Sequence, residues 1–372
     1  MDGKFVGLQE NGVPLDRVET CMLTQIRKLI TSRETPELRS NTGGAPLVSF
    51  VVIVYDMPQQ AENTLHSLSA KFQRGASEAD YEVIVVENES ANNLSPAFIA
   101  GLPKNFSYHL RAEREPTPVH AINHGVGISL GQYVCVMIDG ARMVTPGLVK
   151  NILRGHRIDD RAVVTVPGYH IGEQVQQEAV EDGYGKEQDQ ALIASIDWRN
   201  NGYELFDIAC FSGSCDDGFF RPCSESNCIS VPRAIWASLG GLDTRFNLRG
   251  GGLVNLDLYR RVLEYPRVVH VSLLGEGTFH QFHDGVTTGG EEREVRDALI
   301  GEMNLQYEAI RGQDYQRPQT TPVFLGEIPL QVLTFVHASA EPLLGSKRPV
   351  TYPPPISILS AKSAKSAKSA KS

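Results

Sequence analysis

The residue best placed to do chemistry is Asp139, which directly follows the apolar run 133–138. A continuous apolar run of this length is typical of a strand buried on both faces of a parallel sheet. The small residues Gly140 and Ala141 come next and would let a ligand approach the backbone. Because ligands gather at the carboxyl ends of strands in open α/β sheets, we expect a binding site at Asp139.

Two histidines, His280 and His283, form a second candidate group with Asp284, just past the strand-like run 268–274. An isolated histidine is more often a hydrogen-bonded structural residue than a ligand. Two histidines beside an acid at the end of a strand are also typical of a functional site. The sequence leaves both interpretations open.

The elements around Asp139 resemble a known family. A helix predicted over 119–130 carries Asn123 and Gly125. Gly131 follows it and leads into the strand that ends at Asp139-Gly140-Ala141, with Pro146 shortly after. This order resembles the N-x-G-x-x-x-x-x-G helix, D-x-D motif and following proline of the family 2 glycosyltransferases. The first aspartate of D-x-D is present, whereas Ala141 replaces the second.

The resemblance implies an α/β protein of the GT-A, nucleotide-diphospho-sugar transferase fold. This fold is Rossmann-like, with a mainly parallel central sheet flanked by helices. The alternation of predicted strands at 48–54, 82–86 and 106–110 with helical segments supports a right-handed, mainly parallel sheet. A Rossmann oxidoreductase is excluded, because the first strand is not followed by G-x-G-x-x-G.

The resemblance also extends to the ends of the first two strands. Tyr55 and Glu87 correspond to positions that lie against the base and ribose of a nucleotide, and a carboxylate can accept from ribose hydroxyls. Taken alone, a tyrosine such as Tyr55 is more often an ordinary aromatic at a strand end. The residues implied to bind a nucleotide-diphosphate sugar donor are Val54, Tyr55, Asp56, Glu87, Asn123, Asp139, Gly140 and Ala141.

A divalent cation, Mn²⁺ or Mg²⁺, is a further implication of the resemblance. Many GT-A enzymes hold the cation with the D-x-D aspartate and a histidine past a late strand, which here implies Asp139, His280 and His283. We favour His280, because it follows an aromatic residue. On an extended chain, the odd separation of His280 and His283 predicts opposite faces, so both need not reach one ion.

The acceptor side is implied by residues 226–233 and 239–246, which resemble the family's N-x-x-x-R-R and G-G-F-D-x-x-F stretches. The helix that follows opens in the family with G-x-E-D-x-D-L, but here Val254 and Asn255 replace the acidic pair. Asp257 is retained, yet two helical residues span about 200°, so it should face away from Asn255 and pair with an arginine. The catalytic candidates are therefore Glu225, ranked first as general base, then Asp216 and Asp217, with Asn255 and Asp257 on the helix.

Composition limits the other possibilities. The 372 residues are 41% apolar with a formal net charge of −9, which indicates a globular chain and argues against a nucleic-acid partner. No run of about 18 apolar residues and no signal-like N-terminus is present, so we expect no transmembrane segment and a cytoplasmic location. The clustered Cys210, Cys215, Cys223 and Cys228 lack common zinc-site spacing and are expected to be buried free thiols.

Four segments are expected along the chain. They are an N-terminal helical extension (1–46, with an amphipathic helix at 16–32), a GT-A domain (47–290), C-terminal packing segments (291–359) and a disordered Ser-Ala-Lys tail (360–372). Within the GT-A domain, residues 172–190 predict an exposed helix or lid.

The predicted function is metal-dependent, inverting transfer of a sugar from a nucleotide-diphosphate donor to a saccharide, lipid or other hydroxyl acceptor. The alternative is a non-catalytic nucleotide-sugar binding module. Loss of the second D-x-D aspartate and of the acidic pair at 254–255 favours that alternative.

Overall fold

The computed structural model describes residues 44–283, 285 and 293–344. The chain divides into two compact units, Met1–Gly44 and Ala45–Ser372, and every element below belongs to the second unit. The helix expected at 16–32, the tail 360–372 and Asp284 lie outside the described residues.

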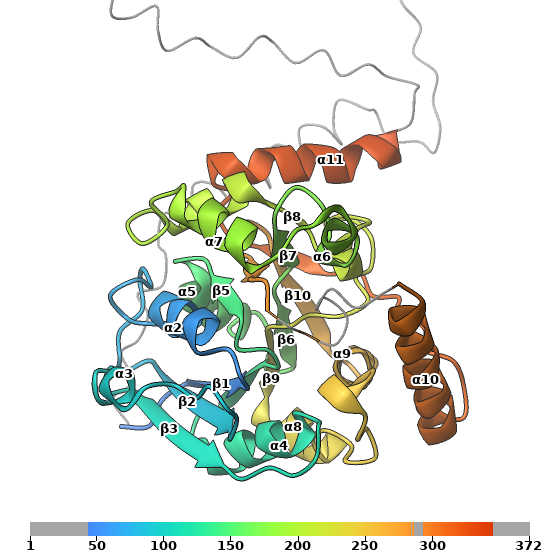
Figure 1. Ribbon diagram of the computed structural model, residues 1–372, viewed down its shortest axis with the longest axis horizontal. Coiled ribbons are helices and arrows are strands. Elements are labelled where there is room, and N and C mark those ends of the chain that lie inside the picture. The colour runs from blue at the N-terminus through green and yellow to red at the C-terminus, as the bar shows by residue number, and fades with distance from the viewer. Residues whose placement is uncertain (1–43, 284, 286–292, 345–372) are drawn as a thin grey trace, which may run out of the picture. The chain divides into compact units, whose positions relative to one another are not determined.

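A sheet of eight strands forms the centre of this unit (Figure 1). Seven strands run parallel to one another, and β9 runs antiparallel to both of its neighbours, β4 and β6. In pairing order, the strands are β12 (Val323–Leu325), β10 (Val269–Leu273), β6 (Ala162–Thr165), β9 (Ile229–Pro232), β4 (Tyr133–Met137), β1 (Val48–Val54), β2 (Tyr81–Asn88) and β3 (Phe106–Arg111).

The apolar runs explain the middle of this sheet. All seven residues of β1 are buried, and the last four of β4 are buried beside it. A strand covered on both faces needs no polar alternation, which is why the runs are continuous. The mainly parallel sheet expected from the sequence is therefore confirmed.

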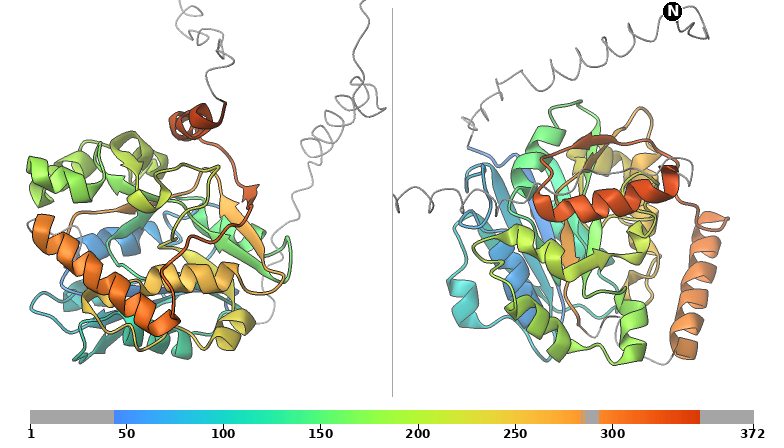
Figure 2. Two further views of the ribbon diagram at one scale, coloured as in Figure 1. Left: turned by 90° about the vertical axis from the view of Figure 1, so that its right-hand side faces the viewer. Right: turned by 90° about the horizontal axis from the view of Figure 1, so that it is seen from above.

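Helices cover the sheet and connect its strands. They are α2 (Pro58–Ser67), α3 (Pro96–Ala100), α4 (Val119–Ile128), α5 (Leu148–Gly155), α6 (Gln176–Ala179), α7 (Lys186–Ala194), α8 (Arg233–Leu239), α9 (Val254–Leu263), α10 (Arg293–Arg311) and α11 (Leu333–Leu344). α10 lies beside α9, to which its last residue is hydrogen-bonded (Figures 1 and 2). No described helix is both long and apolar enough to cross a membrane.

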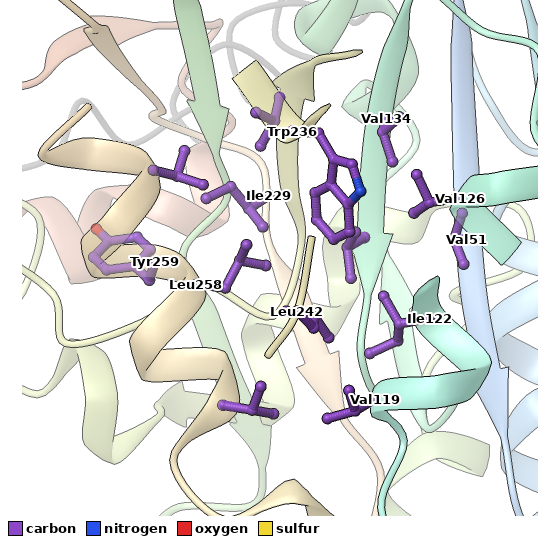
Figure 3. Close-up of a cluster of buried hydrophobic side chains, with 14 of the residues drawn as sticks. Val51, Val119, Ile122, Val126, Val134, Ile229, Trp236, Leu242, Leu258 and Tyr259 are labelled. Atoms are coloured by element: carbon purple, nitrogen blue, oxygen red, sulfur yellow. The ribbon is translucent and has the colours of Figure 1, made fainter. Parts of the chain in front are cut away.

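The main core lies between the sheet and the helices α4, α8 and α9 (Figure 3). Val119, Ile122 and Val126 of α4 are buried and face Val51 of β1 and Val134 of β4. Leu130, which the helical spacing would add to the same stripe, lies beyond α4 and is 69% exposed. Trp236, Leu258 and other side chains from α8 and α9 complete the cluster. This packing fixes the position at which β4 ends.

A second sheet, of four strands, was not predicted. It contains β5 (Arg142–Val144), β11 (Thr278–His280), β7 (Gly168–Ile171) and β8 (Ala209–Phe211), in that order. Its aromatic core includes Tyr169 and Phe279, whose rings stack with centroids 5.2 Å apart. Strands of three or four residues are too short to show a two-residue period, so sequence periodicity cannot reveal them.

Candidate metal and donor site

The two sheets bring Asp139, His280 and His283 together. Nε2 of His280 lies 2.9 Å from Oδ2 of Asp139, and Nε2 of His283 lies 3.6 Å from Oδ1. The two Nε2 atoms are 3.2 Å apart. Among the described residues, these three side chains form the cluster whose ligand atoms all lie within 4.8 Å of one another.

The expectation that the two histidines point to opposite faces is wrong. His280 is the last residue of β11, and residues 281–283 are not in a strand. Strand alternation therefore stops at His280. The chain turns, and His283 returns to the same carboxylate.

Gln176 of α6 determines how His280 presents its ring. Nε2 of Gln176 donates to the carbonyl oxygens of His280 (3.1 Å) and Ile171 (3.5 Å), so its Oε1 is the atom facing Nδ1 of His280, at 2.5 Å. An amide oxygen can only accept. The hydrogen-bond network therefore assigns the proton to Nδ1 and leaves the lone pair on Nε2, directed at Asp139.

The charges at this cluster make the arrangement unusual. Burial, with Arg142 adding to it, lowers the pKa of His280 to about 4, so its ring is neutral at pH 7. Burial alone would raise the pKa of Asp139, but attraction to His283 outweighs it and holds that pKa well below its usual value, so the carboxylate is ionised at pH 7. A carboxylate and a lone pair thus face each other at 2.9 Å, an arrangement that a cation between them would stabilise.

Arg142 is a functional candidate that the sequence reasoning missed. It is 7% exposed, its Nε lies 3.6 Å from Oδ2 of Asp139, and its Nε and Nη1 have no hydrogen-bond partner among the described residues. Strand β5 pairs it directly opposite His280. A guanidinium with unused donors beside Asp139 is suited to an anionic group such as a diphosphate. Its position immediately after Asp139-Gly140-Ala141 was the available signal.

Tyr55 and Asp56 lie where the resemblance implies, at the carboxyl end of β1, next to β4. Tyr55 is 57% exposed. Asp56 has a left-handed φ of 54°, and its Oδ1 accepts from the backbone N–H and Nδ2 of Asn92. Val54 before them is fully buried. An aromatic ring and an ordered carboxylate are therefore available at this strand end.

Glu87, at the same edge, has another use in this conformation. Its side chain is fully buried, and it accepts from the backbone N–H of Leu94 (3.0 and 3.2 Å) and the hydroxyl of Tyr108 (2.5 Å). Burial raises its pKa, which these hydrogen bonds partly offset. Glu87 holds the loop that follows β2, and a nucleotide could reach it only by replacing those bonds.

Three motif residues are explained by packing. A Cβ on Gly140 would come within 2.5 Å of the carbonyl oxygen of Ile53. The missing side chain therefore makes room for the backbone of β1, and not for a ligand. Ala141 is fully buried, and its N–H donates to Oδ1 of Asp139. Asn123 exchanges two hydrogen bonds with the backbone of Leu242, which joins α4 to the segment after α8.

Glu225 contacts α9, the helix in which Val254 and Asn255 replace the acidic pair of the family. Nδ2 of Asn255, in the first turn of α9, donates to Oε2 of Glu225 (2.5 Å), and Nδ2 of Asn227 lies 3.3 Å from Oε1. Glu225 remains partly exposed. Asn255 stands where the family has an acidic residue, and the carboxylate of Glu225, from another segment, is held beside it.

Asp257 faces away from Asn255, as the helical geometry predicts. It is fully buried and bonded to Nε of Arg261 (2.7 Å) and to Nε and Nη2 of Arg311 (2.6 and 2.8 Å). The expected pairing with an arginine is therefore present. Asp216 and Asp217 are exposed and form ion pairs with Arg317, so their carboxylates are already engaged.

The clustered cysteines do not gather into one site. Sγ of Cys228 lies 3.5 Å from Sγ of Cys135, a residue of β4 that is not among the four clustered cysteines. The described cysteines are free thiols, buried or half-buried.

The chain resembles known glycosyltransferases. A family model described as glycosyl transferase family 2 matches residues 49–213, whereas no curated protein matches the chain. One similar solved structure is S. aureus TarS 1–349 in complex with UDP-GlcNAc, with 10% identity, 70% of this chain and 66% of that chain covered, and a TM-score of 0.45. Another is a mannosyltransferase from Pyrobaculum calidifontis in complex with GDP-Man and Mn²⁺, with 13% identity, coverages of 87% and 78%, and a TM-score of 0.42.

The matched segment contains β1, β2, β4 and Asp139, on which the family resemblance was first drawn. The resemblance to family 2 glycosyltransferases is confirmed for this segment, as is the GT-A class of α/β fold. This match supports sugar transfer as the activity.

Proposed function

We propose that this chain is a glycosyltransferase that transfers a sugar from a nucleotide-diphosphate donor to a hydroxyl acceptor, with a divalent cation at Asp139, His280 and His283. The observation that carries the proposal is the convergence of the three ligand atoms, with the lone pair of His280 oriented by Gln176. A purely structural histidine would instead direct its N–H at the carboxylate.

The donor set fits a cation of borderline character. One carboxylate oxygen and two imidazole nitrogens suit Mn²⁺ better than Mg²⁺, which prefers oxygen ligands. When bound, the cation would offset the negative charge that develops on the departing nucleoside diphosphate. Arg142 adds a fixed positive charge beside Asp139, and Tyr55 and Asp56 offer a ring and a carboxylate to the nucleotide.

Inversion by single displacement requires a group that removes the acceptor hydroxyl proton. Glu225 is the best candidate, because Asn255 and Asn227 orient a partly exposed carboxylate at the start of α9. Asp257 is occupied by two arginines. Glu225→Gln should lower turnover about 100-fold or more while leaving donor affinity nearly unchanged. Asp216→Asn is the matched control, and equal rates in both variants would exclude Glu225 as the base.

The proposal is tested by incubating the full chain with UDP- and GDP-sugars, with and without Mn²⁺ or Mg²⁺, and measuring release of the nucleoside diphosphate. We expect metal-stimulated release that His280→Ala and His283→Ala each reduce. Calorimetric titration with Mn²⁺ alone provides a readout that does not depend on activity. Donor binding without release would favour the non-catalytic binding module, and absence of Mn²⁺ binding would exclude the metal site.

A further inference from the structure

A cavity of about 310 Å³, lined by polar and apolar side chains alike, opens between α2, α7 and the loop that follows α7. Its volume is at the small end of ligand pockets, which begin at about 300 Å³. Gln59, Gln60 and Asn63 line it from α2, and Gln190 lines it from α7. None of these residues belongs to the candidate metal and donor site.

The floor of the cavity is fixed by Gln281, which is 1% exposed. Its Nε2 donates to the carbonyl oxygen of Gln60 (3.0 Å), and its Oε1 accepts from Nδ2 of Asn63 (2.9 Å). Gln60 in turn donates to the carbonyl oxygen of Phe282 (2.8 Å). Since His280 and His283 flank these two residues, the floor and the proposed metal ligands share one short segment.

The rim offers hydrogen-bonding groups with unused capacity. Nε2 of Gln190 donates to Oε1 of Gln59 (2.7 Å), and Nη2 of Arg199 donates to Oδ1 of Asn63 (3.1 Å). Each side-chain amide has two N–H groups and two lone pairs, so Gln59 and Gln190, with one bond each, and Asn63, with two, keep donors and acceptors for a ligand. The ring of Trp198 borders the cavity but is only 4% exposed, because it packs against His66 and Phe72 and lies 4.5 Å from the guanidinium of Arg199.

This lining selects a class of ligand. Two carboxylates, Asp189 and Asp197, accompany the single Arg199, which disfavours phosphates, and the many amides disfavour a lipid chain. The amides and carboxylates suit the hydroxyl groups of a sugar, and the apolar side chains of Ile193 and Ile196 suit its C–H surfaces. We propose that this cavity binds a saccharide unit of the acceptor, an inference that rests on the proposed function.

Binding can be followed directly through Trp198. The chain has two tryptophans, so Trp236→Phe leaves Trp198 as the sole reporter. We would titrate this variant with glucose, galactose, mannose, N-acetylglucosamine and their disaccharides, without nucleotide or metal, and with glycerol as the non-saccharide control. At least one saccharide should give a saturable fluorescence change. Calorimetry on the unmodified chain replaces this reporter if Trp236→Phe does not fold.

Variants of the rim complete the test. Gln59→Ala and Asn63→Ala should each weaken the bound saccharide at least tenfold and lower transfer, while donor hydrolysis without acceptor stays unchanged. Gln319→Ala, an exposed glutamine bonded to a nearby carbonyl, is the matched control. Because the titrations need no donor or metal, they decide the saccharide site even if the chain shows no transferase activity.

Two outcomes would overturn the proposal. The first is that no saccharide binds and the rim variants keep full transfer. The second is that these variants weaken nucleotide-sugar binding but not nucleoside-diphosphate binding, which would assign the cavity to the donor sugar.

Discussion

Two aspartates, the half-buried Asp139 and the fully buried Asp257, occupy motif positions but lie in opposite electrostatic surroundings. Asp257 is bonded to Arg261 and Arg311, so its charge is matched by fixed cations. Asp139 faces two imidazoles, one of them a neutral ring with its lone pair directed inward, and Arg142 only at 3.6 Å. The difference shows that a retained acid indicates function only when its charge is left for a ligand to balance.

The largest expected effect is on stability, in Asp257→Asn. This change removes the charge shared by two partly buried guanidinium groups and leaves Arg311 with only Asp243, and breaking such a pair typically costs about 3–5 kcal/mol. Urea unfolding should show the loss, whereas Mn²⁺ affinity should stay normal. Glu264→Gln is the control on the same helix, because its exposed pair with Arg260 should contribute less than about 1 kcal/mol. Equal losses would remove the contrast between the two aspartates.

Asp139→Asn should produce the opposite pattern. The change keeps the shape but removes the charge, so turnover should fall about 100- to 1000-fold, as expected for a lost charge-stabilising group. Mn²⁺ should raise the melting temperature of the wild type but not of this variant. Full activity in the variant would exclude metal-assisted departure of the nucleoside diphosphate.

Gln176 provides a finer test of the metal cluster, because His280 is the only proposed ligand to which its side chain is hydrogen-bonded. Gln176→Ala should weaken Mn²⁺ affinity about 10- to 100-fold, the range for a lost outer partner of a metal-bound histidine. Gln176→Glu should restore part of it, since a carboxylate oxygen can also accept from Nδ1. The neighbouring Gln177→Ala is the control, as Oε1 of Gln177 has no partner among the described residues. Unchanged affinity in Gln176→Ala would argue that His280 orients itself.

The smallest expected effect is on the pH dependence of stability and concerns His270, a buried histidine whose two ring nitrogens both have hydroxyl partners. Its two ring nitrogens face the hydroxyls of Thr165 (2.9 Å) and Thr320 (2.8 Å), and burial lowers its pKa from 6.5 to about 4. Between those pH values the unfolded chain binds a proton that the folded chain does not, so stability falls as the pH drops through this window. From pH 6.5 to 5, the wild type should lose roughly 1–2 kcal/mol more than His270→Gln in urea unfolding. Identical acid sensitivity would contradict this assignment.

The sequence alone was sufficient for the features that depend on local pattern. Continuous apolar runs located β1, β2 and β4, and therefore placed Asp139 at the end of a central strand. Helical geometry predicted that Asp257 turns away from Asn255, and its bonds to Arg261 and Arg311 agree. These features follow from periods of two and 3.6 residues, which a short window of sequence contains.

The tertiary structure decided which distant residues meet. Gln176 reaches His280 across 104 residues, and Asn255 reaches Glu225 across 30, because a second sheet and a helix bring them together. The strands of the second sheet are too short to show a period. The sequence therefore could not predict that His283 lies beside Asp139, or that the lone pair of His280 points at that carboxylate. The roles of Gly140 and Asn123 were likewise set by neighbours far along the chain, Ile53 and Leu242. Contacts of this kind depend on three-dimensional packing, and a local pattern carries no information about them.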